Sequence, residues 1–274
     1  MSHITTTTGR RIYYDESGTG SPVLLIPGQG GYRRGCLTWL AEALAPRFLV
    51  VAMDNRDAAE SEPETAYYGL ADMAGDAAAL LAALGIDRAH VLGHSLGGAI
   101  ALHLALDHPA RVDRLVLVSP GVGGEPGHRA GEPLPPTGEW WRDDPVERMR
   151  LWLPDILGPD YRAQMSEADA AAIVGLERGS RTTWAGMMRQ EAATGGDGLL
   201  DRLVEVRAPT LVIHGDADVA VPLERGQALA DGIPGARFVV LAGVGHLPWV
   251  ERPDATIGAI LASLTEAGEP IPAG

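Results

Sequence analysis

The sequence of 274 residues predicts an α/β fold with a mostly parallel central sheet and flanking helices. Short continuous apolar runs, such as residues 23–26, recur along the chain and are typical of parallel strands that are buried on both faces. Segments with helical spacing of apolar residues follow most of these runs, and this alternation is the pattern of an α/β sheet. The alternation stops at residue 122 and resumes near residue 207, so we expect one inserted segment.

Before this interruption, turn and helix-end signals delimit the elements. An early edge strand ends at the turn Ser17-Gly18-Thr19-Gly20, and the first helix ends at Ala45-Pro46 because proline cannot continue a helix. Gly85 is the expected C-cap of a later helix. The expected strands are residues 11–16, 23–26, 48–53, 89–92 and 115–118, and the expected helices are residues 37–44, 70–84 and 96–106.

After the interruption, the chain returns to the same alternation. Pro253 suits the first turn of the closing helix, where a backbone N–H is not needed. The interrupting segment opens with a stretch rich in glycine and proline at 121–138 and continues as helix-like pieces that contain tryptophans. The expected strands are residues 210–213 and 237–241, and the expected helices are residues 223–230 and 253–264.

The composition argues against several classes of protein. The formal net charge is −14 and there is no basic stripe, which argues against nucleic-acid binding. The single cysteine, Cys36, excludes an internal disulfide framework and is typical of a reducing compartment. There is no run of about 18 apolar residues that could span a membrane, and the N-terminus has no apolar signal region. We therefore expect a cytoplasmic protein, and the sequence does not indicate an oligomeric state.

Residues Gly93-His94-Ser95-Leu96-Gly97 form a G-x-S-x-G pattern between an expected buried strand and an expected helix. Such a turn holds a serine hydroxyl out from the backbone, in a strained conformation, where it can attack a carbonyl. Glycines two residues before and after the serine remove side chains that would collide where strand and helix approach closely. Ser95 is therefore the candidate nucleophile.

Two later motifs could complete a catalytic triad. His214-Gly215-Asp216-Ala217-Asp218 follows one expected strand, and Gly243-Val244-Gly245-His246 follows the next. A serine nucleophile needs a histidine base and a carboxylate that orients this base. The order serine, acid, histidine is the one expected with this serine turn. His246 is thus the candidate base, and Asp216 and Asp218 compete for the role of the acid.

Together these motifs resemble those of the α/β-hydrolase superfamily, from about residue 10 to about residue 266. In that family an H-G-x-x-D turn supplies the acid and a G-H-x-P turn the base, which here match the turn ending at Asp218 and Gly245-His246-Leu247-Pro248. The resemblance therefore implies Asp218 as the acid, with Asp216 as a turn residue that bonds to its own backbone. His94 and His214 are expected to support the site rather than act as the base.

The resemblance also implies an oxyanion hole made of backbone N–H groups. One donor would be Leu96, which follows the nucleophile, and the other would be Gln29 in the loop Pro27-Gly28-Gln29-Gly30-Gly31. Pro27 stands where family members often have histidine.

A second loop, residues 54–61, resembles the family's D-x-R-G-x-G-x-S loop, but both glycines are replaced. Non-glycine residues restrict the backbone. The sequence therefore leaves the fine structure of this loop open, and we expect the loop to be scaffold near the pocket.

The inserted segment lies where this family places a lid. The resemblance thus implies a hydrolase core formed by residues 1–121 and 208–274, and a helical cap formed by residues 122–207. A lid over an apolar substrate would present aromatic and sulfur-containing side chains to it. Alternatively, these side chains form only the cap's own core and its seam with the main domain. The candidate substrate-binding residues are Trp140, Trp141, Trp152, Trp184, Met187 and Met188.

The function implied by these motifs is that of a serine hydrolase acting on a small-to-medium hydrophobic carboxylic ester through an acyl-enzyme. No cofactor is implied, and there is no cluster of cysteine and histidine residues to indicate a metal site. The same triad also serves thioesterases, lactonases, C–C bond hydrolases and cofactor-free haloperoxidases or perhydrolases. A non-catalytic ligand receptor of the same fold is a further alternative, which an intact triad disfavours.

Overall fold

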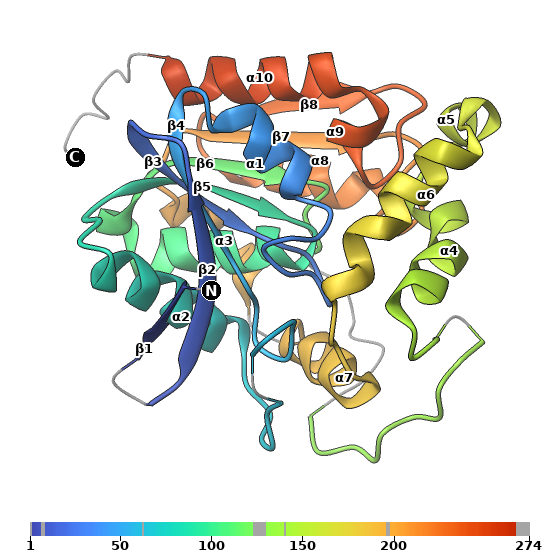
Figure 1. The fold of residues 1–274 in the computed structure, drawn as a ribbon. Helices are drawn as coiled ribbons and strands as arrows, with labels where there is room; N and C mark the ends of the chain where they lie inside the picture. Colours follow the sequence, from blue (N-terminus) through green and yellow to red (C-terminus); the bar gives the residue numbers. More distant parts are fainter. Residues whose placement is uncertain are drawn as a thin grey trace.

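The central sheet of the described chain contains eight strands in the spatial order β1-β2-β4-β3-β5-β6-β7-β8 (Figure 1). β1 pairs with β2, and β2 with β4, in antiparallel orientation, whereas the other neighbouring strands are parallel. The predicted mostly parallel α/β fold is therefore confirmed. The computed structural model describes residues 2–6, 9–61, 63–122, 130–139, 141–195 and 198–266. The strands are β1 (Ser2–Thr5), β2 (Arg11–Ser17), β3 (Ser21–Ile26), β4 (Phe48–Met53), β5 (Ala89–His94), β6 (Val112–Val118), β7 (Thr210–Gly215) and β8 (Arg237–Leu241).

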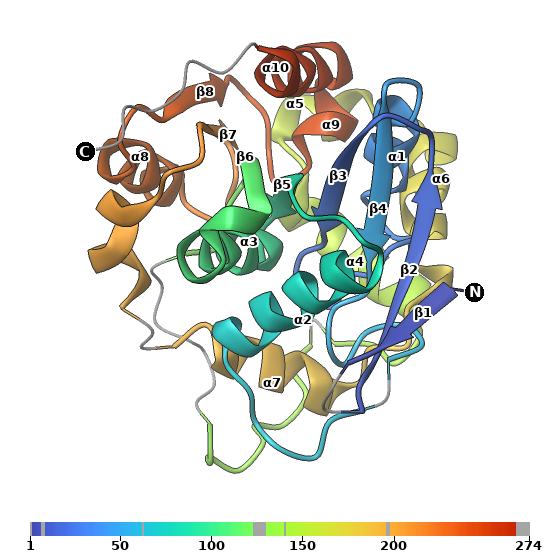
Figure 2. The same ribbon diagram turned by 90° about the vertical axis from the view of Figure 1, so that its left-hand side faces the viewer.

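Alternate side chains of the buried strands serve opposite faces of the sheet. In β3, Leu24 and Ile26 belong to one hydrophobic cluster, and Val23 and Leu25 belong to the other. Because both faces are apolar, both are covered by helices. Helices α2, α3 and α8 cover the first face, and α1 and α10 cover the second (Figure 2). Their bounds are α1 (Thr38–Leu44), α2 (Leu70–Ala83), α3 (Leu96–Asp107), α8 (Leu223–Gly232) and α10 (Pro253–Thr265), with the short α9 (Pro248–Glu251) before α10.

Within the residues that the structure describes, the segment between β6 and β7 contains helices joined by loops. Figure 1 places its helices together, beyond one end of the sheet. Met149 and Leu153 of α4 belong to the same hydrophobic cluster as Ile173 of α6 and Leu247, which follows β8. The segment therefore shares a core with one face of the sheet. Its elements are α4 (Pro145–Ile156), α5 (Pro159–Gln164), α6 (Glu167–Gly175), the 3-10 helix η2 (Leu176–Gly179), α7 (Trp184–Ala193) and the 3-10 helix η3 (Leu199–Glu205).

All predicted strands and helices are present, and the differences lie mainly at their ends. β6 begins three residues before the predicted start. The prediction missed these residues because Asp113 and Arg114 interrupt the apolar run, although Arg114 is buried in the structure. The sequence does not predict β1, an edge strand with largely exposed side chains that pairs only with β2. Among the described residues, no helix is long and apolar enough to cross a membrane.

Candidate active site

Ser95 occupies the turn between β5 and α3 in a strained backbone conformation, with φ 53° and ψ −122°. A Cβ atom on Gly97 would lie 2.1 Å from the Ile26 carbonyl oxygen, and one on Gly93 would lie 2.1 Å from the Gly97 carbonyl oxygen. Neither position can hold a larger residue without movement of the backbone. The Ser95 N–H donates to the Val118 carbonyl at 3.0 Å, which helps to hold a conformation that costs about 1–3 kcal/mol.

Asp218 and His246 meet at the ends of β7 and β8. His246 Nδ1 lies 2.7 Å from Asp218 Oδ2, and this contact places the imidazole proton on Nδ1. The other carboxylate oxygen, Oδ1, accepts hydrogen bonds from the N–H groups of Ala220 at 3.0 Å and Val221 at 2.9 Å. Burial raises the pKa of Asp218, but its contacts with His214 and His246 outweigh burial and hold this pKa well below its usual range.

The structure brings Asp218, and not Asp216, to His246. The Asp216 carboxylate instead accepts a hydrogen bond from the Gly243 N–H at 2.7 Å and so ties the loop after β7 to the loop after β8. His214 Nε2 lies 2.9 Å from the Val221 carbonyl and 3.4 Å from Asp218 Oδ2, so its proton is directed mainly to the carbonyl. The stronger histidine contact of Asp218 is therefore the one with His246.

His94 packs against His246. Its Nε2 lies 3.0 Å from the His246 carbonyl, and its ring lies 4.6 Å from the His246 ring and 4.7 Å from the Trp249 ring, between centroids. Burial, together with the nearby His246, holds the pKa of His94 well below its usual value. His94 is thus a neutral packing residue. On the other side, the His246 N–H donates to the carbonyl of Ile156 at the end of α4, at 2.8 Å.

The loop after β3 lies beside Ser95. Gly28, Gln29, Ser95 and Leu96 line one common cavity with His246. A Cβ on Gly28 would lie 3.1 Å from the Ser95 Cβ, so the loop backbone closely approaches the nucleophile candidate. The structure therefore brings the predicted oxyanion donors and the predicted triad to one place.

Helix α7 anchors this loop, a role that the sequence does not indicate. Gln190 is fully buried; its Oε1 accepts from the Gly30 N–H at 2.7 Å, and its Nε2 donates to the Arg56 carbonyl at 2.5 Å. The Gln29 side chain donates to the Met187 carbonyl and to the Glu191 carboxylate, each at 3.1 Å. Gln190 lies 160 residues from Gly30 along the chain, so no local pattern reveals the contact.

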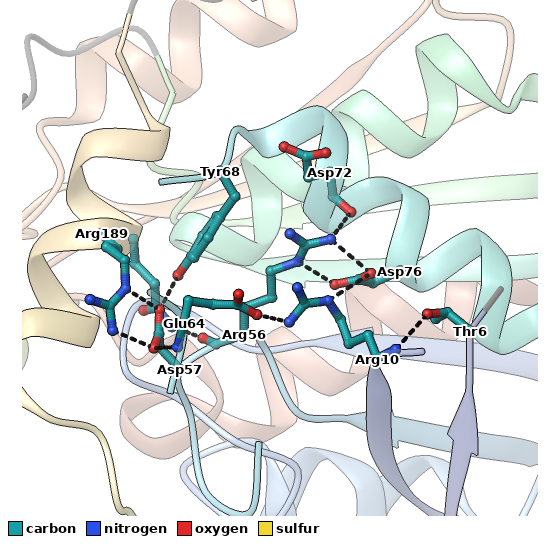
Figure 3. A network of polar contacts seen from close by, with 10 residues as sticks. Thr6, Arg10, Arg56, Asp57, Glu64, Tyr68, Asp72, Asp76 and Arg189 are labelled. Atoms are coloured by element: carbon teal, nitrogen blue, oxygen red, sulfur yellow. Dashed lines mark hydrogen bonds and ion pairs between the residues drawn. The ribbon is translucent and has the colours of Figure 1, made fainter. Parts of the chain in front are cut away.

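The second loop keeps the backbone conformation that its missing glycines would favour. Asp57 and Ala59, which replace those glycines, have φ values of 60° and 46°. Asp57 is held by its side chain, which accepts from Arg189 at 2.7 and 2.9 Å, from Tyr68 at 2.9 Å and from the Glu64 N–H at 2.9 Å (Figure 3). These polar contacts stabilise the left-handed conformation of Asp57 without a glycine.

The cavity beside Ser95 has a volume of about 840 Å³. Four of the candidate substrate-binding residues line it, namely Trp152, Trp184, Met187 and Met188. Trp141 packs against Trp184, with 5.3 Å between the ring centroids, and Trp140 lies outside the described residues.

Two buried charged residues that the sequence analysis missed, Arg148 and Glu177, also line the cavity. Within the described part of the chain, no cluster of three or more His, Cys, Asp or Glu residues is arranged to hold a metal ion.

Comparisons with known proteins agree with this architecture. Residues 21–151 match the family model described as the alpha/beta hydrolase fold. The chain is 31% identical over 266 residues to the putative carbamate hydrolase RutD of Azorhizobium caulinodans, covering 89% of this chain and 91% of that protein. The chain belongs to the α/β-hydrolase family.

Two further relatives carry more specific names. The 2-hydroxymuconate semialdehyde hydrolase of Pseudomonas sp. strain CF600 is 32% identical over 255 residues, which cover 89% of this chain and 87% of that protein. The crystal structure of the enol-lactonase from Burkholderia xenovorans LB400 is similar with a TM-score of 0.80 and 25% identity, and the match covers 97% and 100% of the two chains. This hydrolase thus resembles enzymes with different named activities.

Proposed function

We propose that this hydrolase cleaves small-to-medium hydrophobic carboxylic esters with Ser95, His246 and Asp218 as a catalytic triad. The observation that carries the proposal is the 2.7 Å contact between His246 Nδ1 and Asp218, beside the cavity that Ser95 lines from its strained turn. A histidine oriented in this way leaves Nε2 available to accept a proton from a serine hydroxyl.

In the proposed mechanism, Ser95 Oγ attacks the ester carbonyl carbon while its proton passes to His246 Nε2. Asp218 stabilises the resulting imidazolium, and the backbone N–H groups of Leu96 and Gln29 donate to the oxyanion of the tetrahedral intermediate. The intermediate collapses, the C–O bond to the alcohol breaks, and His246 returns the proton to the leaving oxygen. Water, deprotonated by His246, then attacks the acyl-enzyme and releases the acid and Ser95.

The lining of the cavity supports an apolar substrate. Trp152, Trp184, Met187 and Met188 come from α4 and α7, which belong to the inserted segment 122–207. In our proposal this segment acts as a cap whose aromatic and thioether side chains contact the substrate's apolar part. The cap and the core formed by residues 1–121 and 208–274 are thus functional units of one site.

Lactones and C–C bonds next to a carbonyl are the second class of candidate substrates. They are favoured by the names of two relatives, an enol-lactonase and a 2-hydroxymuconate semialdehyde hydrolase. Both reactions would use the same serine and oxyanion donors.

Turnover of p-nitrophenyl acetate by the wild-type protein and by Ser95→Ala tests the proposal. We expect the wild type to release p-nitrophenol and Ser95→Ala to lose nearly all of this activity. Ser119→Ala is the matched control, because Ser119 also has a positive φ, 44°, and its buried hydroxyl has no hydrogen-bond partner among the described residues. Equal activity of Ser95→Ala and the wild type would refute the proposed nucleophile.

A further inference from the structure

Glu177 is a buried acid at the edge of the substrate cavity, and its carboxyl group has no hydrogen-bond partner in the described part of the chain. It lies in η2, is 8% exposed and lines the cavity. Among the residues that the structure describes, no hydrogen-bond donor and no ion-pair partner reaches its carboxyl group. Burial raises the pKa of Glu177 to about 7, and the more distant charge of Arg148 only partly opposes this rise. A buried carboxyl group in such a position lacks the partners that buried polar groups normally have.

Arg148 borders the same cavity from α4. Its guanidinium lies 4.4 Å from the centroid of the Trp141 ring and 5.7 Å from that of Trp152. One terminal nitrogen donates to the Arg142 carbonyl at 2.7 Å, and the other is 3.4 Å from Ser180 Oγ, a long contact. A guanidinium has five N–H donors, so the fixed contacts of Arg148 leave donors available.

The two residues do not form a structural ion pair. Arg148 and Glu177 are both at least 92% buried, yet no ion-pair contact within 4.0 Å joins them in the described structure. If Arg148 and Glu177 only stabilised the fold, we would expect them to contact each other directly, because buried charges are normally paired. The available donors of Arg148 and the unpartnered acceptor of Glu177 therefore point to a third group between them.

We propose that Glu177 and Arg148 form the polar end of the substrate cavity and bind a hydroxyl group of the substrate. This inference rests on the proposed esterase function and narrows its substrates to hydroxy esters whose hydroxyl is remote from the reacting carbonyl. A hydroxyl donates to Glu177 and accepts from Arg148 through one oxygen atom. A carboxylate at this point would face the Glu177 carboxylate, and an ammonium group would face the Arg148 guanidinium. A neutral group that both donates and accepts suits both residues.

Binding to the Ser95→Ala protein, followed by tryptophan fluorescence, tests the inference without turnover. The ligands are a short series of ω-hydroxy acid methyl esters of increasing chain length, the monoacetates of the matching diols, and the unsubstituted ester of each. We expect at least one hydroxylated ligand to bind about tenfold more tightly than its unsubstituted partner, because the parent ester leaves buried polar groups unpaired.

Variants at Glu177 test whether this residue causes the preference for hydroxylated ligands. Glu177→Leu should abolish the hydroxyl preference, and Glu177→Gln should retain part of it, because an amide still accepts a hydrogen bond. Glu147→Leu is the matched control, since Glu147 is exposed on the same helix as Arg148 and does not line the cavity. The inference is overturned if no hydroxylated ligand is preferred, if the preference survives in Glu177→Leu, or if ligands ending in a carboxylate or an ammonium group bind better. Failure of the esterase proposal is separate, because it appears as p-nitrophenyl acetate turnover that does not depend on Ser95.

Discussion

At the scale of single residues, the position of Ser95 depends on two glycines, which are required because a side chain at either position would collide with the backbone. Gly97 and Gly93 lie so close to neighbouring carbonyl groups that a Cβ would come within 2.1 Å of an oxygen atom. The strained φ of Ser95 can therefore persist only while strand β5 and helix α3 remain in close contact. The conformation of Ser95 thus depends on the close packing of β5 against α3.

Gly97→Ala should remove most of the esterase activity and lower the free energy of unfolding by more than about 1 kcal/mol, because the backbone around Ser95 must move. The control is Gly75→Ala in α2, where an added Cβ meets nothing within 4 Å. That change should leave activity intact and raise the unfolding free energy by about 0.5–1 kcal/mol. Activity assays and urea unfolding of both variants check the prediction; similar effects of the two changes would contradict it.

Asp218→Asn should lower kcat by about 10⁴, because an amide at this position no longer holds His246 in the required tautomer. Asp216→Asn should have a far milder effect, because Asp216 contacts the Gly243 N–H and not His246. Steady-state kinetics of the two variants compare the two carboxylates directly. The opposite order of effects would show that the acid is wrongly assigned.

The sequence predicts residues of this site when a local motif contains them. Ser95, Asp218 and His246 each lie in a short pattern at the end of an apolar run, so their proximity could be predicted. Arg148, Glu177 and Gln190 have no such pattern. Each lies on a helix of the inserted segment, and Gln190 acts through partners that lie far away in the sequence.

At the scale of secondary-structure elements, α7 connects the inserted segment to the loop that lies beside Ser95. Gln190 satisfies the Gly30 N–H and the Arg56 carbonyl with one side chain, and Arg189 binds Asp57 in the neighbouring loop (Figure 3). Both loops after β3 and β4 are therefore positioned by one helix. A change in α7 should affect the chemical step as well as the fit of the substrate.

Gln190→Leu should lower kcat for p-nitrophenyl acetate by about tenfold to a hundredfold, because displacement of the loop weakens one oxyanion donor. It should also cost about 1–3 kcal/mol of stability, since two buried backbone groups lose their partner. Gln190→Glu, which keeps the acceptor for Gly30, should retain more activity than Gln190→Leu. Gln227→Leu on α8 removes an exposed glutamine and is the control. A loss confined to KM would contradict a role in positioning the loop.

The elements themselves are well predicted because most buried strands contain an uninterrupted apolar run and several helices end next to glycine or proline. The sequence-based prediction is weaker where burial is one-sided, as in the exposed edge strand β1. It is also weaker where charged residues begin a strand, as Asp113 and Arg114 do in β6. In these places the hydrogen bonds of the sheet, rather than the local apolar pattern, decide the conformation.

At the scale of the whole molecule, the unpartnered acid of the cavity should reduce stability in a defined pH range. The pKa of Glu177 is about 7 in the folded protein and near 4.5 in the unfolded chain. Between these values the folded state binds the proton more strongly, so the unfolding free energy falls as the pH rises through this range. Tyr32 and Cys36, which lie near Glu177, have raised pKa values and do not titrate there.

Glu177→Gln should therefore stabilise the protein relative to the wild type by about 3 kcal/mol more at pH 8 than at pH 4.5. Urea unfolding of both proteins at the two pH values measures this difference, and the contributions of other carboxylates cancel between them. A difference that is the same at both pH values would show that Glu177 is paired or solvated in the folded protein.

The central claim is that Ser95 forms a covalent acyl-enzyme inside the cavity. Rapid acid quenching of the wild-type protein during turnover of p-nitrophenyl butyrate, followed by mass spectrometry of the intact chain and of its peptides, tests this claim most directly. We predict a mass increase of one butyryl group, located on the peptide that contains Ser95, and its absence from Ser95→Ala. A butyryl group on another residue, or ester turnover without any trapped adduct together with undiminished activity of Ser95→Ala, would contradict the account.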